Sequence, residues 1–304
     1  MRYSLFSLAF VPVFFMLTAC NQAGQTEKQP SVKDTETTGK FDIQRGTNIS
    51  HWLSQSDRRG DDRQTFFTRD DMEYIASLGY DHIRLPIDEE QMWNKEGTRE
   101  EAAFDLLHSA IQWALDNDLK VVVDLHIIRS HHFNEEEKPL WTDPEAQETF
   151  IDLWRDLSAT LHEYPTDMVA YELMNEAVAD HAGEWNQLLA RAHAAVRELE
   201  PNRKIVIGSN RWQSVDTFHE LKVPEGDKNI ILSFHYYSPF LLTHHQASWT
   251  YIKDYEGPVH YPGKTVKEED LEGYSDEVKE AVATANGVFT KESMAEHIDK
   301  AVVV

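Results

Sequence analysis

One pair of polar residues in this 304-residue chain has the type and the setting for acid chemistry. Asn175 and Glu176 end the run YELMNE, which occupies positions 171–176. A carboxyl at the end of an apolar strand is partly buried, and burial favours its protonated form. Such a group can donate a proton to a departing oxygen, as one of two carboxyls does when a glycosidic bond is cleaved. Taken alone, the Asn-Glu pair favours the alternative of a glutamate at a helix N-terminus, stabilised by the helix dipole.

Four further candidates lie within or after other short apolar runs. Arg84 lies in IRLPID, His126 ends VVVDLH, and His235 and Tyr237 lie in SFHYY. An arginine can orient a carboxylate, although a strand arginine more often pairs with a neighbour such as Asp88. Each histidine alone could be a hydrogen-bonded core side chain. Their shared position at the ends of apolar runs favours one common site.

The elements that must position these residues alternate in type. Short β-branched or apolar runs predict strands at 43–49, 82–87, 120–126, 168–174, 204–209 and 229–235. Segments with helical period predict helices at 70–78, 104–117, 147–163 and 185–199. This alternation predicts a parallel sheet, and a (β/α)₈ TIM barrel of about 250 residues would bring the strand ends together at one mouth. A doubly wound sheet is the alternative, but no Gly-rich phosphate turn follows the first predicted strand.

The predicted barrel is incomplete. After the sixth strand we expect a long loop over 236–286 and then an amphipathic segment, 291–304, with Met294, Ile298, Ala301 and Val302 on one face. About six of the eight βα units of such a barrel are then present. We therefore expect the chain to be a C-terminally truncated fragment.

The N-terminal residues predict export. Arg2 precedes an apolar run over 5–17, which is typical of a signal peptide and short for a membrane span. Leu17-Thr18-Ala19-Cys20 resembles a bacterial lipobox, so Cys20 is the expected lipidation site rather than an incidental thiol. We expect a signal peptide at 1–19, a flexible tether at 20–40 and a catalytic domain at 41–304. The protein would be anchored to the outer membrane, facing the periplasm or the cell surface.

Charge narrows the class of partner. The chain has 53 acidic and 29 basic residues, and this excess repels phosphate backbones. We expect no nucleic-acid partner, a neutral substrate and a monomer. The doublets at 131–132 and 244–245 could suggest a metal, but no carboxylate or cysteine lies at zinc-site spacing, so no metal and no cofactor are expected.

Together these motifs resemble glycoside hydrolase family 5, the cellulase-type family of retaining barrel enzymes. The resemblance rests on IRLPID, DLH at 124–126, YELMNE and FHYYSPF at 234–240, in this order and spacing. It implies that Glu176 is the acid/base and that Asn175 binds the sugar 2-hydroxyl. It also implies that Arg84, His126, His235 and Tyr237 form the subsite around the scissile bond.

The chain departs from the family pattern at the second carboxylate. The family's nucleophilic glutamate lies in a Gly-Glu-Phe-Gly-like motif at the end of strand seven, and neither this motif nor the strand-eight tryptophan is found here. We expect the nucleophile to be encoded beyond Val304 and this fragment to be inactive. Trp212 and Trp249 are candidates for stacking on sugar rings, although ordinary packing is the alternative.

The sequence thus favours hydrolysis of a β-linked polysaccharide, a β-glucan or β-mannan, by an endo-β-1,4-glycanase. The alternative is a non-catalytic surface lipoprotein that binds glycans. A serine hydrolase would need a Gly-x-Ser-x-Gly turn, which the sequence lacks.

Overall fold

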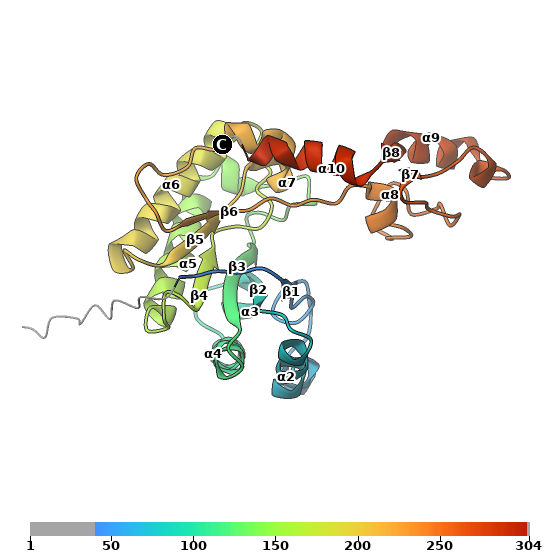
Figure 1. Cartoon of the computed structure of the whole chain (residues 1–304). Coiled ribbons are helices and arrows are strands. Elements are labelled where there is room, and N and C mark those ends of the chain that lie inside the picture. Colours follow the sequence, from blue (N-terminus) through green and yellow to red (C-terminus); the bar gives the residue numbers. More distant parts are fainter. Residues whose placement is uncertain (1–39, 303–304) are drawn as a thin grey trace, which may run out of the picture. The chain divides into compact units, whose positions relative to one another are not determined.

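A parallel sheet of six strands organises the computed structural model, which describes residues 40–302 (Figure 1). The strands are β1 (Gly46–Asn48), β2 (His82–Asp88), β3 (Lys120–Ile127), β4 (Val169–Glu172), β5 (Lys204–Ile207) and β6 (Ile230–Leu232). Each strand pairs with the next one in chain order. A doubly wound sheet would reverse this order at a switch point, so the sequential order is that of a (β/α)₈ barrel. The predicted fold class is confirmed, and within the described residues the sheet is an open section of that barrel.

Helices connect the strands. They are α1 (Gly60–Phe66), α2 (Arg69–Ser77), α3 (Glu89–Met92), α4 (Glu101–Asp116), α5 (Pro144–Leu161), α6 (Ala182–Leu199) and α7 (Asn210–Gln213), with 3₁₀ turns η1 (Pro139–Trp141) and η2 (Val215–Glu220). The four predicted helices correspond to α2, α4, α5 and α6, and each begins somewhat earlier than the apolar period indicated. In α5 the Asp143 side chain accepts a hydrogen bond from the amide of Glu145, with Pro144 in the first turn. This first turn contains no large apolar residue, so a hydrophobic pattern does not reveal it.

Alternating residues of the strands pack on two different cores. Val121 and Val123 of β3 belong to the large core shared with the surrounding helices, whereas Val122 clusters with Phe41, Ala170 and Val206. Successive strand residues point to opposite faces of the sheet. Because the helices cover the face with the large core, this second cluster lies on the other, inner face. Two residues further along β3, the inner position is occupied by a carboxylate, Asp124, and the polar site begins there.

The segment 240–289 is not the loop that the sequence predicted. It contains α8 (Phe240–Thr243), β7 (Gly263–Lys264), η3 (Glu269–Leu271), α9 (Asp276–Ala285) and β8 (Val288–Phe289). Its own core is formed by Leu241, Ile252, Tyr255, Val266 and Val282. The prediction failed because each element is short and the five core residues come from distant points of the segment, which leaves little periodicity.

The chain then returns to the sheet through α10 (Lys291–Ile298) and η4 (Asp299–Ala301). His297 and Lys300 both contact the carboxylate of Asp216 in η2. Ala301 packs against the main core, whereas Val302 is exposed. The predicted apolar face is therefore interrupted where the α-helix gives way to the 3₁₀ turn, since the two helices have different periods.

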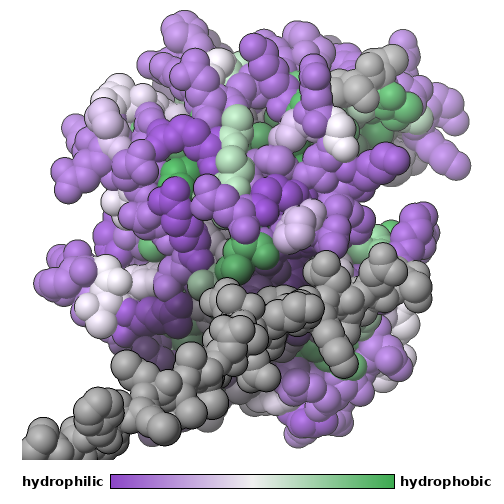
Figure 2. Space-filling view, turned by 90° about the vertical axis from the view of Figure 1, so that its left-hand side faces the viewer, coloured by the Kyte–Doolittle hydropathy of each residue, from purple (hydrophilic) through white to green (hydrophobic). Residues whose placement is uncertain are grey.

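The predicted signal peptide, Cys20 and nearly all of the tether lie outside the described residues. Within residues 40–302, no helix is both long and apolar enough to cross a membrane. Hydrophilic side chains dominate the face shown in Figure 2, as the acidic composition predicts for a solvated surface.

Candidate active site

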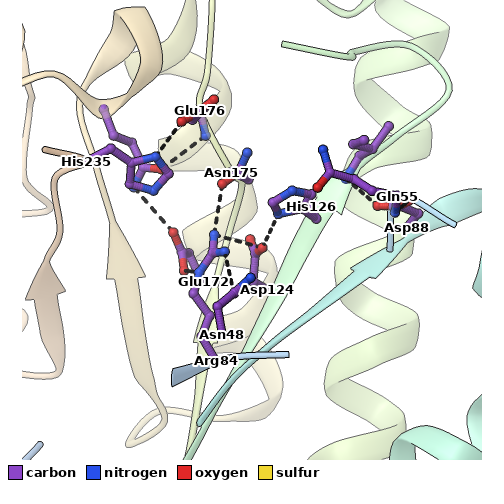
Figure 3. Close-up of polar contacts among 12 residues, drawn as sticks. Asn48, Gln55, Arg84, Asp88, Asp124, His126, Glu172, Asn175, Glu176 and His235 are labelled. Carbon is purple, nitrogen blue, oxygen red and sulfur yellow. Dashed lines mark hydrogen bonds and ion pairs between the residues drawn. The ribbon is translucent and has the colours of Figure 1, made fainter. Parts of the chain in front are cut away.

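Charged and polar side chains from several strands meet at the C-terminal end of the sheet (Figure 3). We call this set the mouth network: Arg84 of β2, Asp124 and His126 of β3, Glu172 of β4, Asn175 and Glu176 after β4, and His235 after β6. In parallel barrels this end carries the site, because the loops that follow the strands converge there. The structure thus brings Arg84, His126, Asn175, Glu176 and His235 together.

Arg84 lies between two buried carboxylates. Its Nε donates to Oε2 of Glu172 at 2.7 Å, and its Nη2 lies 2.8 Å from Oδ2 of Asp124. Asp124 and Glu172 are register partners on β3 and β4, so their like charges would repel without the guanidinium. Asp88, the pairing partner considered from the sequence, accepts instead from the amides of Gln55 and Ile127.

Burial and charge act in opposite directions on Arg84. Burial by itself lowers the pKa of the guanidinium, but the carboxylates of Asp124 and Glu172 outweigh it and raise that pKa above its ordinary value. Arg84 therefore stays charged, and its fixed charge is available to hold neighbouring groups. Asp88 lies outside this arrangement, and burial raises the pKa of its carboxyl to about 6.

Arg84 also orients the side-chain amide of Asn175, the residue before the candidate acid. Its Nη2 donates to Oδ1 of Asn175 at 2.9 Å, and its Nη1 donates to Oδ1 of Asn48. Nδ2 of Asn175 is buried and has no hydrogen-bond partner within residues 40–302. A buried donor of this kind gains most from a ligand oxygen that can accept its proton.

His126 is held by the same carboxylate that holds Arg84. Its Nδ1 lies 2.7 Å from Oδ2 of Asp124, and its ring meets Phe133 edge-on. A carboxylate accepts only, so Nδ1 carries a proton and donates it to Asp124. This contact fixes the orientation of the His126 ring at the mouth of the sheet.

Glu176 is nearly buried and is joined to His235. Nδ1 of His235 lies 2.5 Å from Oε1 of Glu176, and the two side chains are 16% and 11% exposed. Tyr237 meets the His235 ring edge-on at 6.1 Å between centroids. Burial, and after it the charge of Glu176, raises the pKa of the Tyr237 hydroxyl, so this tyrosine stays a neutral donor. The carboxyl of Glu176 is thereby fixed through one oxygen.

The two candidate tryptophans lie in different places. Trp212 borders the mouth network, because its amide donates to the carbonyl of Ala177 and its Nε1 donates to the carbonyl of Phe133. Its side chain is 43% exposed. Trp249 belongs to the 240–289 segment, is 74% exposed and, within residues 40–302, lies outside the hydrogen-bonded mouth network.

Sequence reasoning missed four residues of the site: Asn48, Asp124, Glu172 and Gln213. A signal existed for two of them, because a carboxylate inside the otherwise apolar runs VVVDLH and YELMNE needs a buried partner. Gln213 gave none, since its main chain has φ of 53° in an irregular turn after β5. Within residues 40–302, no group of three or more His, Cys, Asp or Glu could hold a metal ion.

Comparison with known proteins gives consistent matches. The family model described as Cellulase (glycosyl hydrolase family 5) matches residues 39–299. Cellodextrinase A of Ruminococcus flavefaciens is 32% identical over 80% of this chain and 70% of its own length. Endoglucanase C of Acetivibrio thermocellus is 32% identical over 72% of this chain and 65% of its own length. The chain thus spans about two thirds of the length of these curated relatives.

One solved structure with a related sequence is a mutant form of Thermotoga maritima Cel5A in complex with cellobiose. It matches with a TM-score of 0.60 and 27% identity, over 71% of this chain and 72% of that chain.

Proposed function

The chain belongs to glycosyl hydrolase family 5, the cellulase family of glycoside hydrolases, and on this premise we propose that Glu176 is the proton donor of a hydrolase that cleaves the backbone of a β-linked polysaccharide. The curated relatives are named a cellodextrinase and an endoglucanase, and the Thermotoga protein binds cellobiose. The substrate class proposed here is therefore a β-1,4-glucan or a β-mannan of similar shape.

The observation that carries the proposal is the Glu176–His235 pair beside Asn175. Cleavage needs an acid whose proton is aimed at the departing oxygen, and the 2.5 Å contact with His235 fixes the Glu176 carboxyl. The buried Nδ2 of Asn175 is a donor suited to a sugar hydroxyl next to the reacting carbon. A hydrogen bond there strengthens as the ring becomes oxocarbenium-like.

A retaining mechanism also needs a second carboxylate about 5 Å from the acid. Asp124 and Glu172 are close in the network, but Arg84 engages both, and we propose neither as the nucleophile. A nucleophile must be free to attack the sugar carbon, whereas these two groups neutralise the guanidinium.

Two aromatic side chains suit sugar stacking. Trp212 exposes its ring beside the network, and Trp249 exposes its ring on the 240–289 segment. The flat apolar faces of pyranose rings pack on indole. We propose that Trp212 contributes to a subsite next to the scissile bond and Trp249 to a more distant one.

We further propose that the protein is exported and anchored through a lipid on Cys20. The sequence LTAC at 17–20 after an apolar run supports this, and so does a substrate too large to enter a cell. A palmitate-labelling experiment with Cys20→Ala as the control tests the anchor.

The second candidate function is glycan binding without cleavage. It is favoured by one observation: Asp124 and Glu172 are both engaged by Arg84, so Glu176 is the one carboxyl of the mouth network that Arg84 does not hold. Under this reading the protein would retain oligosaccharides at the surface but release no new reducing ends.

One experiment separates these functions. The 304-residue chain and Glu176→Gln are assayed for reducing ends on β-glucan and β-mannan, and for cellotriose binding by calorimetry. Cleavage that is lost in Glu176→Gln while binding is kept supports the hydrolase. Binding without cleavage supports the second function, and the absence of both contradicts the two proposals together.

A further inference from the structure

The main chain of Glu176 adopts a conformation that is uncommon for a glutamate. Its φ is 50°, in the left-handed region that side chains with a Cβ rarely occupy. Such a conformation persists only where surrounding contacts impose it. The amide of Glu176 donates to Oε1 of Gln213 at 3.1 Å, and its carbonyl accepts from Nε2 of His131 at 3.1 Å. Both peptide groups of the candidate acid are therefore held by side chains.

Gln213 also holds the partner of the acid. Its main-chain carbonyl accepts from the amide of His235 at 3.0 Å. Its Nε2 donates to Oε1 of Glu172 at 3.3 Å, while the other oxygen of Glu172 accepts from Arg84. A carboxamide has one acceptor and one donor end, and only this orientation satisfies both neighbours. One residue thus contacts the acid, its histidine and the carboxylate beneath them.

The turn that carries Gln213 is built to point this side chain inward. Arg211, Trp212 and Gln213 have φ of 56°, 59° and 53°, three left-handed residues in succession. The turn is fastened by the Trp212 amide on the carbonyl of Ala177 and by two hydrogen bonds between Asn210 and Ala179. As a result Gln213 is 1% exposed, whereas Trp212 is 43% exposed.

A glycine makes room for the Gln213 side chain. A Cβ added at Gly208 would lie 2.4 Å from both Cγ and Nε2 of Gln213, much closer than real Cβ contacts. The position before the turn therefore accepts only glycine while Gln213 keeps its place. This contact provides a way to displace Gln213 without changing its chemistry.

From these contacts we propose that Gln213 is a positioning residue, which sets the direction of the Glu176 carboxyl and of His235 through their main-chain amides. The inference rests on the proposed function in taking Glu176 as the acid. Gln213 itself touches no substrate, since it lies beneath the acid and is buried. Its role is to hold the proton donor aimed at the departing oxygen.

The test compares two ligands in Gln213→Leu, which keeps the volume and removes the two side-chain hydrogen bonds, to the Glu176 amide and to Glu172, while the main-chain bond to His235 remains. Cellotriose reports ground-state binding. A cellobiose-derived imidazole carries a basic nitrogen in place of the glycosidic oxygen, so its affinity depends on the direction of the acid. We expect the imidazole to bind about tenfold more weakly to Gln213→Leu and cellotriose to bind within about twofold of the wild type. An equal change for both ligands, or no change, would overturn the inference.

A second readout does not depend on sugar binding. The amide of Glu176 loses its acceptor in Gln213→Leu, so its hydrogen exchange, followed by NMR, should accelerate about tenfold or more. Unchanged exchange at this amide refutes the positioning role. If the wild type binds neither ligand, the proposed function fails. The exchange rate then still tests whether Gln213 holds the Glu176 amide.

Two further variants guard against a general loss of structure. Gly208→Ala should reproduce the loss of imidazole affinity, because it displaces the same side chain. Gln91→Leu is the matched control, since Gln91 is also 1% exposed but contacts Ser56 and Arg63 instead of the acid. Gln91→Leu should leave both affinities and the Glu176 amide unchanged, and a loss there equal to that of Gln213→Leu contradicts the proposal.

Discussion

The mouth network and the 240–289 segment hold their side chains in different ways. In the network, the single guanidinium of Arg84 contacts all three of Asp124, Glu172 and Asn175, and the carboxylates are almost fully buried. In the segment, a core of five buried residues supports aromatic rings near the surface, such as Phe240, which stacks on Tyr251 at 5.6 Å. The network depends on charge balance in a buried place, and the segment on a small apolar cluster.

This difference indicates how each region tolerates change. Removing one member of a buried charged network leaves its partners without compensation, which is costly and affects the whole fold. A small separate core can open by itself, since stability is distributed unevenly over a protein. Substitutions in the network should therefore lower the stability of the whole fold, whereas substitutions in the segment should destabilise only that segment.

The largest effect is expected for Arg84→Met. It leaves the carboxylates of Asp124 and Glu172 buried side by side, and we expect the free energy of unfolding to fall by about 3–5 kcal/mol in urea denaturation. Arg69→Met is the control, because Arg69 pairs with Glu73 and Asp116 on the surface and should matter far less. Equal losses in the two variants would remove the distinction between buried and exposed pairs.

The next effect is a pH dependence from His131. Burial lowers the pKa of this imidazole from 6.5 to about 4, so the unfolded chain takes up a proton at a pH where the folded protein does not. Stability from the neutral imidazole is present above pH 6.5 and is lost as the pH falls toward about 4. In His131→Gln, which keeps a donor for the Glu176 carbonyl, this dependence should disappear.

The measurement is urea denaturation of both proteins between pH 7 and 4. Their difference in unfolding free energy should change by about 3 kcal/mol over this range. The raised pKa of Asp88 acts with the opposite sign in both proteins and cancels in the difference. Parallel pH curves for the two proteins are the result that would contradict a buried neutral His131.

The smallest effect separates the two regions directly. Val123 of β3 and Val282 of α9 are both fully buried, and Val→Ala at either position weakens the core in which it lies by on the order of 2 kcal/mol. Val123→Ala should lower the global unfolding free energy. Val282→Ala should leave that value near the wild type and instead speed hydrogen exchange and proteolysis within 240–289. A global loss from Val282→Ala would show that the two cores unfold together.

The sequence by itself determined the main strands and helices and the end of the sheet at which the site lies. Short β-branched runs and helical periods located the six strands of the parallel sheet and four of the helices, because central strands such as β3 and β4 are buried on both faces and read as apolar runs. The placement of Arg84, His126, Asn175, Glu176 and His235 at one end followed from their position in those runs. Such information is local, and a single chain segment contains it.

Only the tertiary structure decided which groups meet. The choice of Asp124 and Glu172 over Asp88 as partners of Arg84 depends on the register between strands, which no single run reveals. The role of Gln213 depends on three left-handed residues and on the space left by Gly208. The core of the 240–289 segment joins residues from Leu241 to Val282. These contacts arise between distant parts of the chain, and their energies exist only once the parts are packed together.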